Sequence, residues 1–241
     1  ASGAISIASS EFSSNTFTGW GGGARLVAPR VDIIATTFTL NSAERGGGLL
    51  LDAPDKADSN WTLTAVNFDR NSASGIAGAL YANGEGQTGS VTLTGDGNAF
   101  VDNRSGSDGG GLYLSEVSGT HIASAWTGNS ADGSGGGIYV RQASLDLVDP
   151  LVRDNNAGLQ GGGMYLEIRG NATCTANPAG TFGFLANVAN DGGGVARWNQ
   201  LESIAGRFSS TGCDFGAVPA DDNSPTDVDG DNHGNDATFT Y

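Results

Sequence analysis

The chain has 241 residues, among them 40 glycines, and its 26 acidic and 11 basic side chains give a net charge of −15. This charge argues against binding to nucleic acid, whose phosphates must be neutralised by Lys and Arg, and against an anionic membrane surface. No apolar run approaches the length of about 20 residues that spans a bilayer, so we expect no membrane insertion.

The N-terminus, ASGAISIASSEF, has neither the basic region nor the apolar region of a signal peptide. It begins instead with the small residues that follow a signal-peptide cleavage site. We therefore expect an exported chain with its signal peptide removed, located outside the cell or on its surface. An alternating segment, AISIA (4–8), follows at once and predicts a strand with one buried face.

A repeat runs through the sequence from this point on. An asparagine recurs every 26 to 32 residues, and a bulky apolar residue such as Phe38, Phe68 or Phe100 stands three positions before it. The asparagines are Asn15, Asn41, Asn71, Asn103, Asn129, Asn155 and Asn187. Six or seven positions after each comes the middle of a small-residue triplet, which is Gly-Gly-Gly in six repeats and Ala77-Gly78-Ala79 in one. Such a period predicts a repeat architecture.

Short alternating segments account for the rest of each repeat. Apolar residues stand two places beyond each triplet centre, and further segments alternate at WTLTA (61–65), SVTLT (90–94) and SLDLV (144–148). A period of two is typical of strands, and no segment has a helical period. Each repeat thus contains about three short strands. We expect the asparagine at a corner, in the left-handed conformation, with its amide bonded to neighbours along the stack.

The pattern predicts an all-β fold, a right-handed parallel β-helix of about seven coils stacked about 4.8 Å apart. Equivalent phenylalanines would stack in the interior, and the glycine triplet would form a bend without side chains. We expect residues 1–207 to form this domain. Residues 208–241, which are acidic, would form a C-terminal cap or connector.

The motif Phe-x-x-Asn followed by Gly-Gly-Gly and Leu, Ile or Ala resembles the repeat of bacterial polymorphic outer-membrane proteins and related right-handed parallel β-helix surface proteins. The resemblance covers about residues 10–200. It implies a secreted or surface-displayed protein that acts in adhesion or as a stalk rather than as an enzyme.

Four tyrosines occupy the same place in consecutive repeats, and their parity predicts that they lie on the outside. They are Tyr81, Tyr113, Tyr139 and Tyr165. A surface ladder of aromatic rings could bind a sugar or a neighbouring subunit, whereas the alternative is cross-strand packing that only stabilises the sheet.

Two features suggest chemistry near the C-terminus. Cys174 and Cys213 are the only cysteines, which fits one disulfide in an oxidising compartment, with two free thiols as the alternative. In DVDGDNHGND (227–236) aspartates alternate with glycines, which places the hard oxygen ligands that Ca²⁺ prefers along a short loop. The predicted calcium ligands are Asp227, Asp229, Asp231 and Asp236. A solvated acidic turn is the alternative.

Enzymatic motifs are weak by comparison. NGEGQTG (83–89) matches a dinucleotide-binding pattern, but a strand-like segment follows it where a helix is required. We expect no catalytic residues and predict a non-enzymatic extracellular structural protein, a subunit of a cell-surface fibre that associates with itself end to end. The alternatives are a monomeric adhesin that binds glycan or a host or cell-surface protein, and a polysaccharide lyase or glycosidase, which would use acidic clusters.

Overall fold

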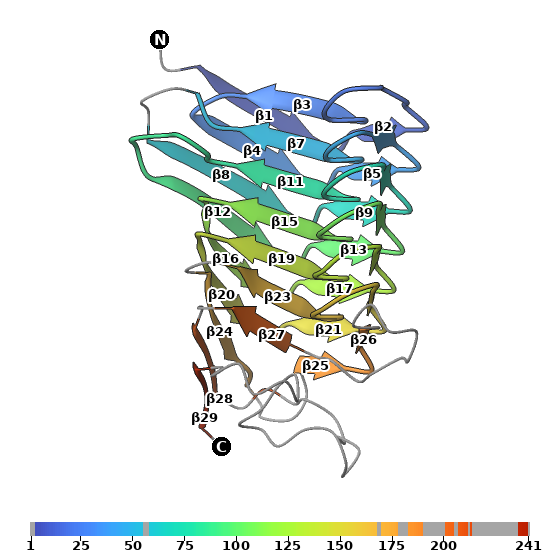
Figure 1. Cartoon of the computed structure of the whole chain (residues 1–241). Helices are drawn as coiled ribbons and strands as arrows, with labels where there is room; N and C mark the ends of the chain where they lie inside the picture. Colours follow the sequence, from blue (N-terminus) through green and yellow to red (C-terminus); the bar gives the residue numbers. More distant parts are fainter. Residues whose placement is uncertain are drawn as a thin grey trace.

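The structure, a computed structural model, describes residues 3–54, 58–167, 170–177, 183–189, 201–204, 207–211, 213 and 236–240. For 201–204, 207–208 and 236–240 only the backbone is described. The described residues form strands joined by short turns, and every strand pair is parallel (Figure 1). None of these residues belongs to a helix that could cross a membrane.

The strands form four parallel sheets that run the length of the stack. The nine-stranded sheet contains β1 (Ala4–Ala8), β4 (Arg30–Ile34), β8 (Ser59–Thr64), β12 (Val91–Asp96), β16 (Ser118–Ile122), β20 (Ser144–Val148), β24 (Asn171–Thr175), β28 (Arg207–Thr211) and β29 (Asp236–Thr240). The second sheet, here called the Phe sheet, contains β2 (Glu11–Ser13), β5 (Thr37–Thr39), β9 (Asn67–Asp69), β13 (Ala99–Val101), β17 (Ala125–Thr127), β21 (Leu151–Arg153) and β25 (Gly183–Leu185).

The other two sheets complete each turn. The six-stranded sheet contains β6 (Ser42–Ala43), β10 (Ser72–Ala73), β14 (Arg104–Ser105), β18 (Ser130–Ala131), β22 (Asn156–Ala157) and β26 (Val188–Ala189). The Tyr sheet contains β3 (Ala24–Val27), β7 (Leu49–Asp52), β11 (Leu80–Asn83), β15 (Leu112–Ser115), β19 (Ile138–Arg141), β23 (Met164–Glu167) and β27 (Leu201–Ile204). The predicted parallel β-solenoid is therefore confirmed, with about six complete turns among the described residues instead of the seven coils expected.

The interior is filled by columns of equivalent apolar side chains. Phe12, Phe38, Phe68 and Phe100 stack with ring centroids 4.8–5.1 Å apart and ring planes within 10° of parallel, and the Trp126 ring continues the stack 5.2 Å beyond Phe100. Stacked aromatic rings stabilise the core beyond the apolar area that they bury. The predicted pile of phenylalanines is present, and it fills the core behind the Phe sheet from turn to turn.

The asparagines form a hydrogen-bonded ladder beside this stack, which is buried from Asn41 to Asn187 and exposed at Asn15. The Oδ1 atom of Asn103 accepts hydrogen bonds from the backbone N and the Nδ2 of Asn71, at 2.9 and 3.0 Å. The Nδ2 of Asn103 donates in turn to Asn129 and to the carbonyl oxygen of Phe68. The ladder members are Asn15, Asn41, Asn71, Asn103, Asn129, Asn155 and Asn187.

One detail of the asparagine prediction is wrong. The left-handed conformation belongs to the residue before each asparagine, such as Leu40 (φ 56°), Arg70 (φ 52°) and Asp102 (φ 53°), and not to the asparagine itself. The reason is that the asparagine must keep its backbone N and its side chain aimed along the stack. The sharp reversal of the chain is therefore placed one residue earlier.

The three glycines of each triplet meet three different constraints. The first, as at Gly109 (φ 68°), has a left-handed backbone, and a Cβ added to it would lie 3.0 Å from the Cβ of Tyr113. A Cβ on the second, Gly110, would collide with the carbonyl oxygens of Gly136 and Ser130. A Cβ on the third, Gly111, would lie 3.0 Å from the Trp126 ring. The triplet thus permits close packing of backbone against backbone and against the core.

We predict that Gly110→Ala destabilises the protein by more than about 3 kcal/mol, because backbone of two neighbouring turns must move apart. The control is Gly86→Ala, at a left-handed glycine (φ 73°) with no atom within 4 Å of an added Cβ, where only the conformational cost of about 1 kcal/mol applies. Urea unfolding of the two variants measures the difference. If Gly110→Ala and Gly86→Ala lose the same free energy of unfolding, the predicted collision at Gly110 does not occur.

Candidate functional site

The tyrosine row does not lie on the surface, which corrects the prediction. Tyr81 is 2% exposed, and Tyr113, Tyr139 and Tyr165 are each 6% exposed. Their side chains do point away from the main core, as the alternation of the strand requires. They are buried because they form a second apolar cluster with Leu50 and Ala77, against which Trp20 and Ile76 pack.

The cluster is closed by the turn that contains the glycine triplet, because the first glycine of the triplet packs on the tyrosine four positions later. Tyr113 and Tyr139 are stacked with ring centroids 4.6 Å apart, and Tyr81 meets Tyr113 edge to face at 5.4 Å. Burial raises the pKa of all three phenols. This geometry favours the alternative of packing over that of an open sugar-binding ladder.

A short charged network borders the tyrosine cluster at the ends of the Tyr sheet strands. Arg141 lies between two carboxylates, with its Nη1 2.8 Å from Glu85 Oε1 and its Nε 3.4 Å from Glu167 Oε2. Ser115 donates a second hydrogen bond, of 2.7 Å, to the same Glu85 oxygen. All three charged groups are partly exposed, and the arginine bridges the two carboxylates. Glu85 comes from the NGEGQTG segment, so this turn is fastened to the stack two turns further on.

The most unusual polar group of the interior is His121. It is fully buried on β16, and neither ring nitrogen has a hydrogen-bond partner among the described residues; the Nε1 of Trp126 also lacks one. The two rings meet edge to face at 5.3 Å. Space for the imidazole comes from Gly95, its partner on β12, where an added Cβ would collide with the ring. Desolvation lowers the pKa of His121 from 6.5 to about 4.

We predict a loss of stability in acid that depends on His121. Below pH 6.5 the unfolded chain takes up a proton, whereas the folded chain does so only near pH 4. The free energy of unfolding therefore falls between these two pH values, by about 3 kcal/mol from this group. His121→Leu should remove that part of the pH dependence, as measured by urea unfolding at several pH values.

The control for this experiment is Ser118→Ala, an exposed position of the same strand, which should keep the pH dependence of the parent chain. If His121→Leu shows the same decrease in stability between pH 6.5 and 4, the imidazole is not the group responsible.

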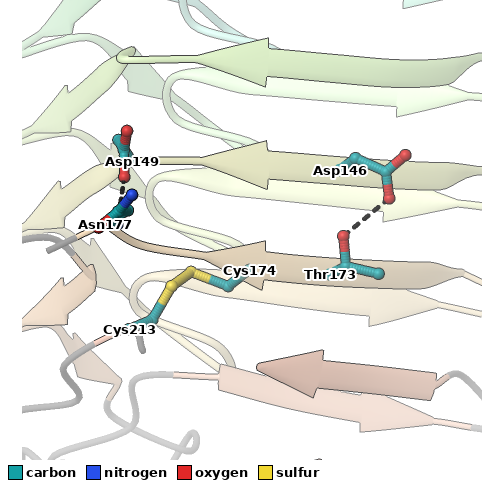
Figure 2. Close-up of a disulfide and its surroundings, with 6 residues drawn as sticks. All are labelled: Asp146, Asp149, Thr173, Cys174, Asn177 and Cys213. Atoms are coloured by element: carbon teal, nitrogen blue, oxygen red, sulfur yellow. Dashed lines mark hydrogen bonds between the residues drawn. A yellow bond between two sulfur atoms is a disulfide. The ribbon is translucent and has the colours of Figure 1, made fainter. Parts of the chain in front are cut away.

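Cys174 and Cys213 are joined by a disulfide, with Cα atoms 6.2 Å apart (Figure 2). Cys174 is 1% exposed and faces the core from β24, whereas Cys213 lies two residues beyond β28 and is partly buried against the core. The bond closes a loop of 39 residues. It thus ties the chain that follows β28 to the last turns of the solenoid.

We predict that Cys213→Ser lowers the stability of the C-terminal turns by about 4 kcal/mol in the chain-entropy model, because the unfolded chain regains the freedom of the open loop. Thermal unfolding of this variant should resemble that of the parent chain in a reductant. Adding reductant to the variant is the control and should change nothing. An unchanged unfolding temperature in both cases would show that the bond contributes no stability.

The predicted calcium site cannot be placed. Asp227, Asp229 and Asp231 lie outside the described residues, and of Asp236 only the backbone is described, at the start of β29. Within the part of the chain that the structure describes, no group of three His, Cys, Asp or Glu side chains could hold a metal ion. Calcium binding by the tail stays a prediction, as does the domain boundary at residue 207.

The first described turn of the solenoid has strand edges without a described partner. β1, β2 and β3 each have a strand partner on one side only among the described strands. The inward residues Ile5, Ile7 and Phe12 are half-buried, whereas their equivalents in the second turn, Val31 and Ile33 among them, are 0–2% exposed. This end therefore offers both backbone hydrogen-bonding groups and apolar surface.

Comparison with protein-family models, with curated proteins and with solved structures finds no match for this chain. Its function must therefore be argued from its own residues and geometry.

Proposed function

We propose that the protein is a non-enzymatic structural component of the outside of a bacterial cell, related to the polymorphic outer-membrane-protein type of surface β-helix. In this proposal, copies associate end to end into a fibre. The observation that supports it is the first described turn, where strand edges without a partner among the described strands and half-buried apolar side chains occur together. Such edges are templates for pairing with another chain.

The two ends of the nine-stranded sheet support this arrangement. Among the described strands, β1 is the first of the sheet and β29 is the last, and the two lie at opposite ends of the stack (Figure 1). All pairs in the sheet are parallel, so a second copy placed against β1 through its last strand would continue the same sheet in the same sense. A head-to-tail contact of this kind does not close on itself and produces a filament.

The asparagine ladder supports the same partner. Asn15 donates from its backbone N and its Nδ2 to Asn41, but no described group donates to its Oδ1 atom. Every later asparagine from Asn41 to Asn187 accepts from the preceding turn at this atom. Asn15 therefore presents the acceptor end of a ladder that a further turn would extend.

We predict that the parent chain forms larger species as its concentration rises, and that Ile7→Lys abolishes them. The lysine would place a charge on the apolar end of the first turn, where a second copy would have to bury it at high cost. Sedimentation velocity over a range of concentrations, with negative-stain microscopy of the assembled fraction, measures the effect.

The matched control is Ser6→Lys, which adds the same charge one residue away on the outward face of β1 and should leave association unchanged. A parent chain that stays monomeric at every concentration would overturn the proposal. Loss of association in both lysine variants would assign the contact to general charge effects instead of the open end.

A further inference from the structure

The outward face of the nine-stranded sheet carries a column of short polar side chains. Strand register places six of them directly above one another on successive turns: Asp32, Thr62, Thr94, Thr120, Asp146 and Thr173. Each side chain ends in a hydroxyl or a carboxylate, and each is exposed or half-buried. Neighbouring members are one strand spacing apart, about 4.8 Å.

Two neighbouring members of the column are joined by a hydrogen bond. Thr173 Oγ1 donates a hydrogen bond of 2.8 Å to Asp146 Oδ1 on the neighbouring strand (Figure 2). At this step the polar ends of two adjacent turns are within reach of each other. The register places a hydroxyl or a carboxylate at each of the six turns, so a ligand that lies along the column would meet a hydrogen-bonding group at every one of them.

A second column lies two residues further along the same strands and is partly apolar. Ile34 and Ile122 belong to it, and at 41% exposure each they are among the few large exposed apolar residues that the structure describes. Thr64 and Asp96 lie between the two isoleucines in this column, and Val148 and the methyl group of Thr175 continue it towards the C-terminus. A polar line and a partly apolar line therefore run side by side along the axis of the solenoid.

From these two columns we infer a binding face for an extended neutral polysaccharide that lies along the solenoid axis. A sugar ring has hydroxyls at its edge, which donate and accept hydrogen bonds, and C–H groups on its faces, which pack on apolar side chains. One pyranose unit of an extended chain is about as long as one strand spacing. Each turn would thus meet one sugar, with its hydroxyls on the polar column. The C–H face would pack on Ile34, Ile122 or Val148 at three of the turns, whereas Thr64 and Asp96 offer further hydrogen-bonding groups at the two turns between the isoleucines.

Charge selects the class of polysaccharide. The chain has a net charge of −15, and Asp32 and Asp146 stand in the polar column itself. Carboxylates accept hydrogen bonds from neutral sugar hydroxyls, but they repel uronates and sulfated sugars. The two carboxylates also interrupt the threonine pattern, which disfavours a regular ice lattice as the ligand more than a chain of sugars.

The other broad faces are less suitable. The outward residues of the Tyr sheet are covered in the second apolar cluster, and the strands of the Phe sheet are only three residues long. The nine-stranded sheet has strands of five and six residues and continues over the whole stack. Since this face runs along the side of the solenoid, the inference does not depend on end-to-end assembly.

Affinity electrophoresis tests the inference, with hydroxyethyl cellulose, xylan, galactomannan or mixed-linkage β-glucan in the gel, and with polygalacturonate as the acidic comparison. We predict that at least one neutral polymer retards the parent chain and that polygalacturonate does not. The combined variant Thr62→Ala, Thr94→Ala and Thr120→Ala should raise the dissociation constant by about tenfold or more, because three hydroxyls that bind the sugar chain are lost.

The matched control replaces three outward threonines of the Phe sheet with alanine, namely Thr37, Thr39 and Thr127, and should bind as the parent does. Thermal unfolding of both variants verifies that each is folded. Absence of retardation by every neutral polymer, or equal retardation of the two variants, would overturn the inference. If the protein inhibits ice recrystallisation and no polysaccharide retards it in the gel, the ligand of this face is ice and the inference is wrong.

Discussion

The rest of the structure depends on the buried asparagine ladder, which fixes the register of every turn on the next. Each buried Oδ1 receives two donors, and a slip by one residue would leave these groups unpaired at a cost of about 1–3 kcal/mol for each. Register errors in parallel sheets turn every side chain to the opposite face. With the ladder in place, the phenylalanines, tyrosines and outward threonines must form columns, so core and surface share one constraint.

The ladder also explains where backbone strain is tolerated. Leu40, Arg70 and Asp102 have left-handed backbones just before their asparagines, a conformation that costs roughly 1–2 kcal/mol for residues other than glycine. Only Gly128 meets the same corner without this cost. The strain persists because the asparagine that follows is held by hydrogen bonds from the turn before it. Stacking thus selects the local conformation, and the intrinsic preference of each residue is secondary.

Much of the fold could be predicted from the sequence because its constraint repeats: Phe38, Asn41 and Gly47 recur in fixed order, and repetition implies stacking. The burial of the tyrosines could not be predicted, since it depends on how the triplet turn folds over the sheet, and alternation reports only which face a residue occupies. The column of Thr94, Thr120 and Asp146 could not be predicted from the sequence either. Turns differ in length by up to six residues, and only the register shows which positions coincide.

β16 contributes side chains to both faces of the nine-stranded sheet. Thr120 stands in the centre of the polar column, and its neighbour His121 enters the core where the other turns place Ile33, Leu63 or Leu147. Gly95 supplies the room that the His121 ring takes, and Gly111 lies against the Trp126 ring, while three nitrogen atoms of these two rings have no hydrogen-bond partner among the described residues. Because a buried polar atom without a partner costs free energy, these nitrogens make the turn less stable than one whose core is wholly apolar. Since desolvation lowers the pKa of His121, acid reduces the stability of the core directly beneath Thr120, so the outward face at β16 is coupled to the protonation of a residue on the inward face.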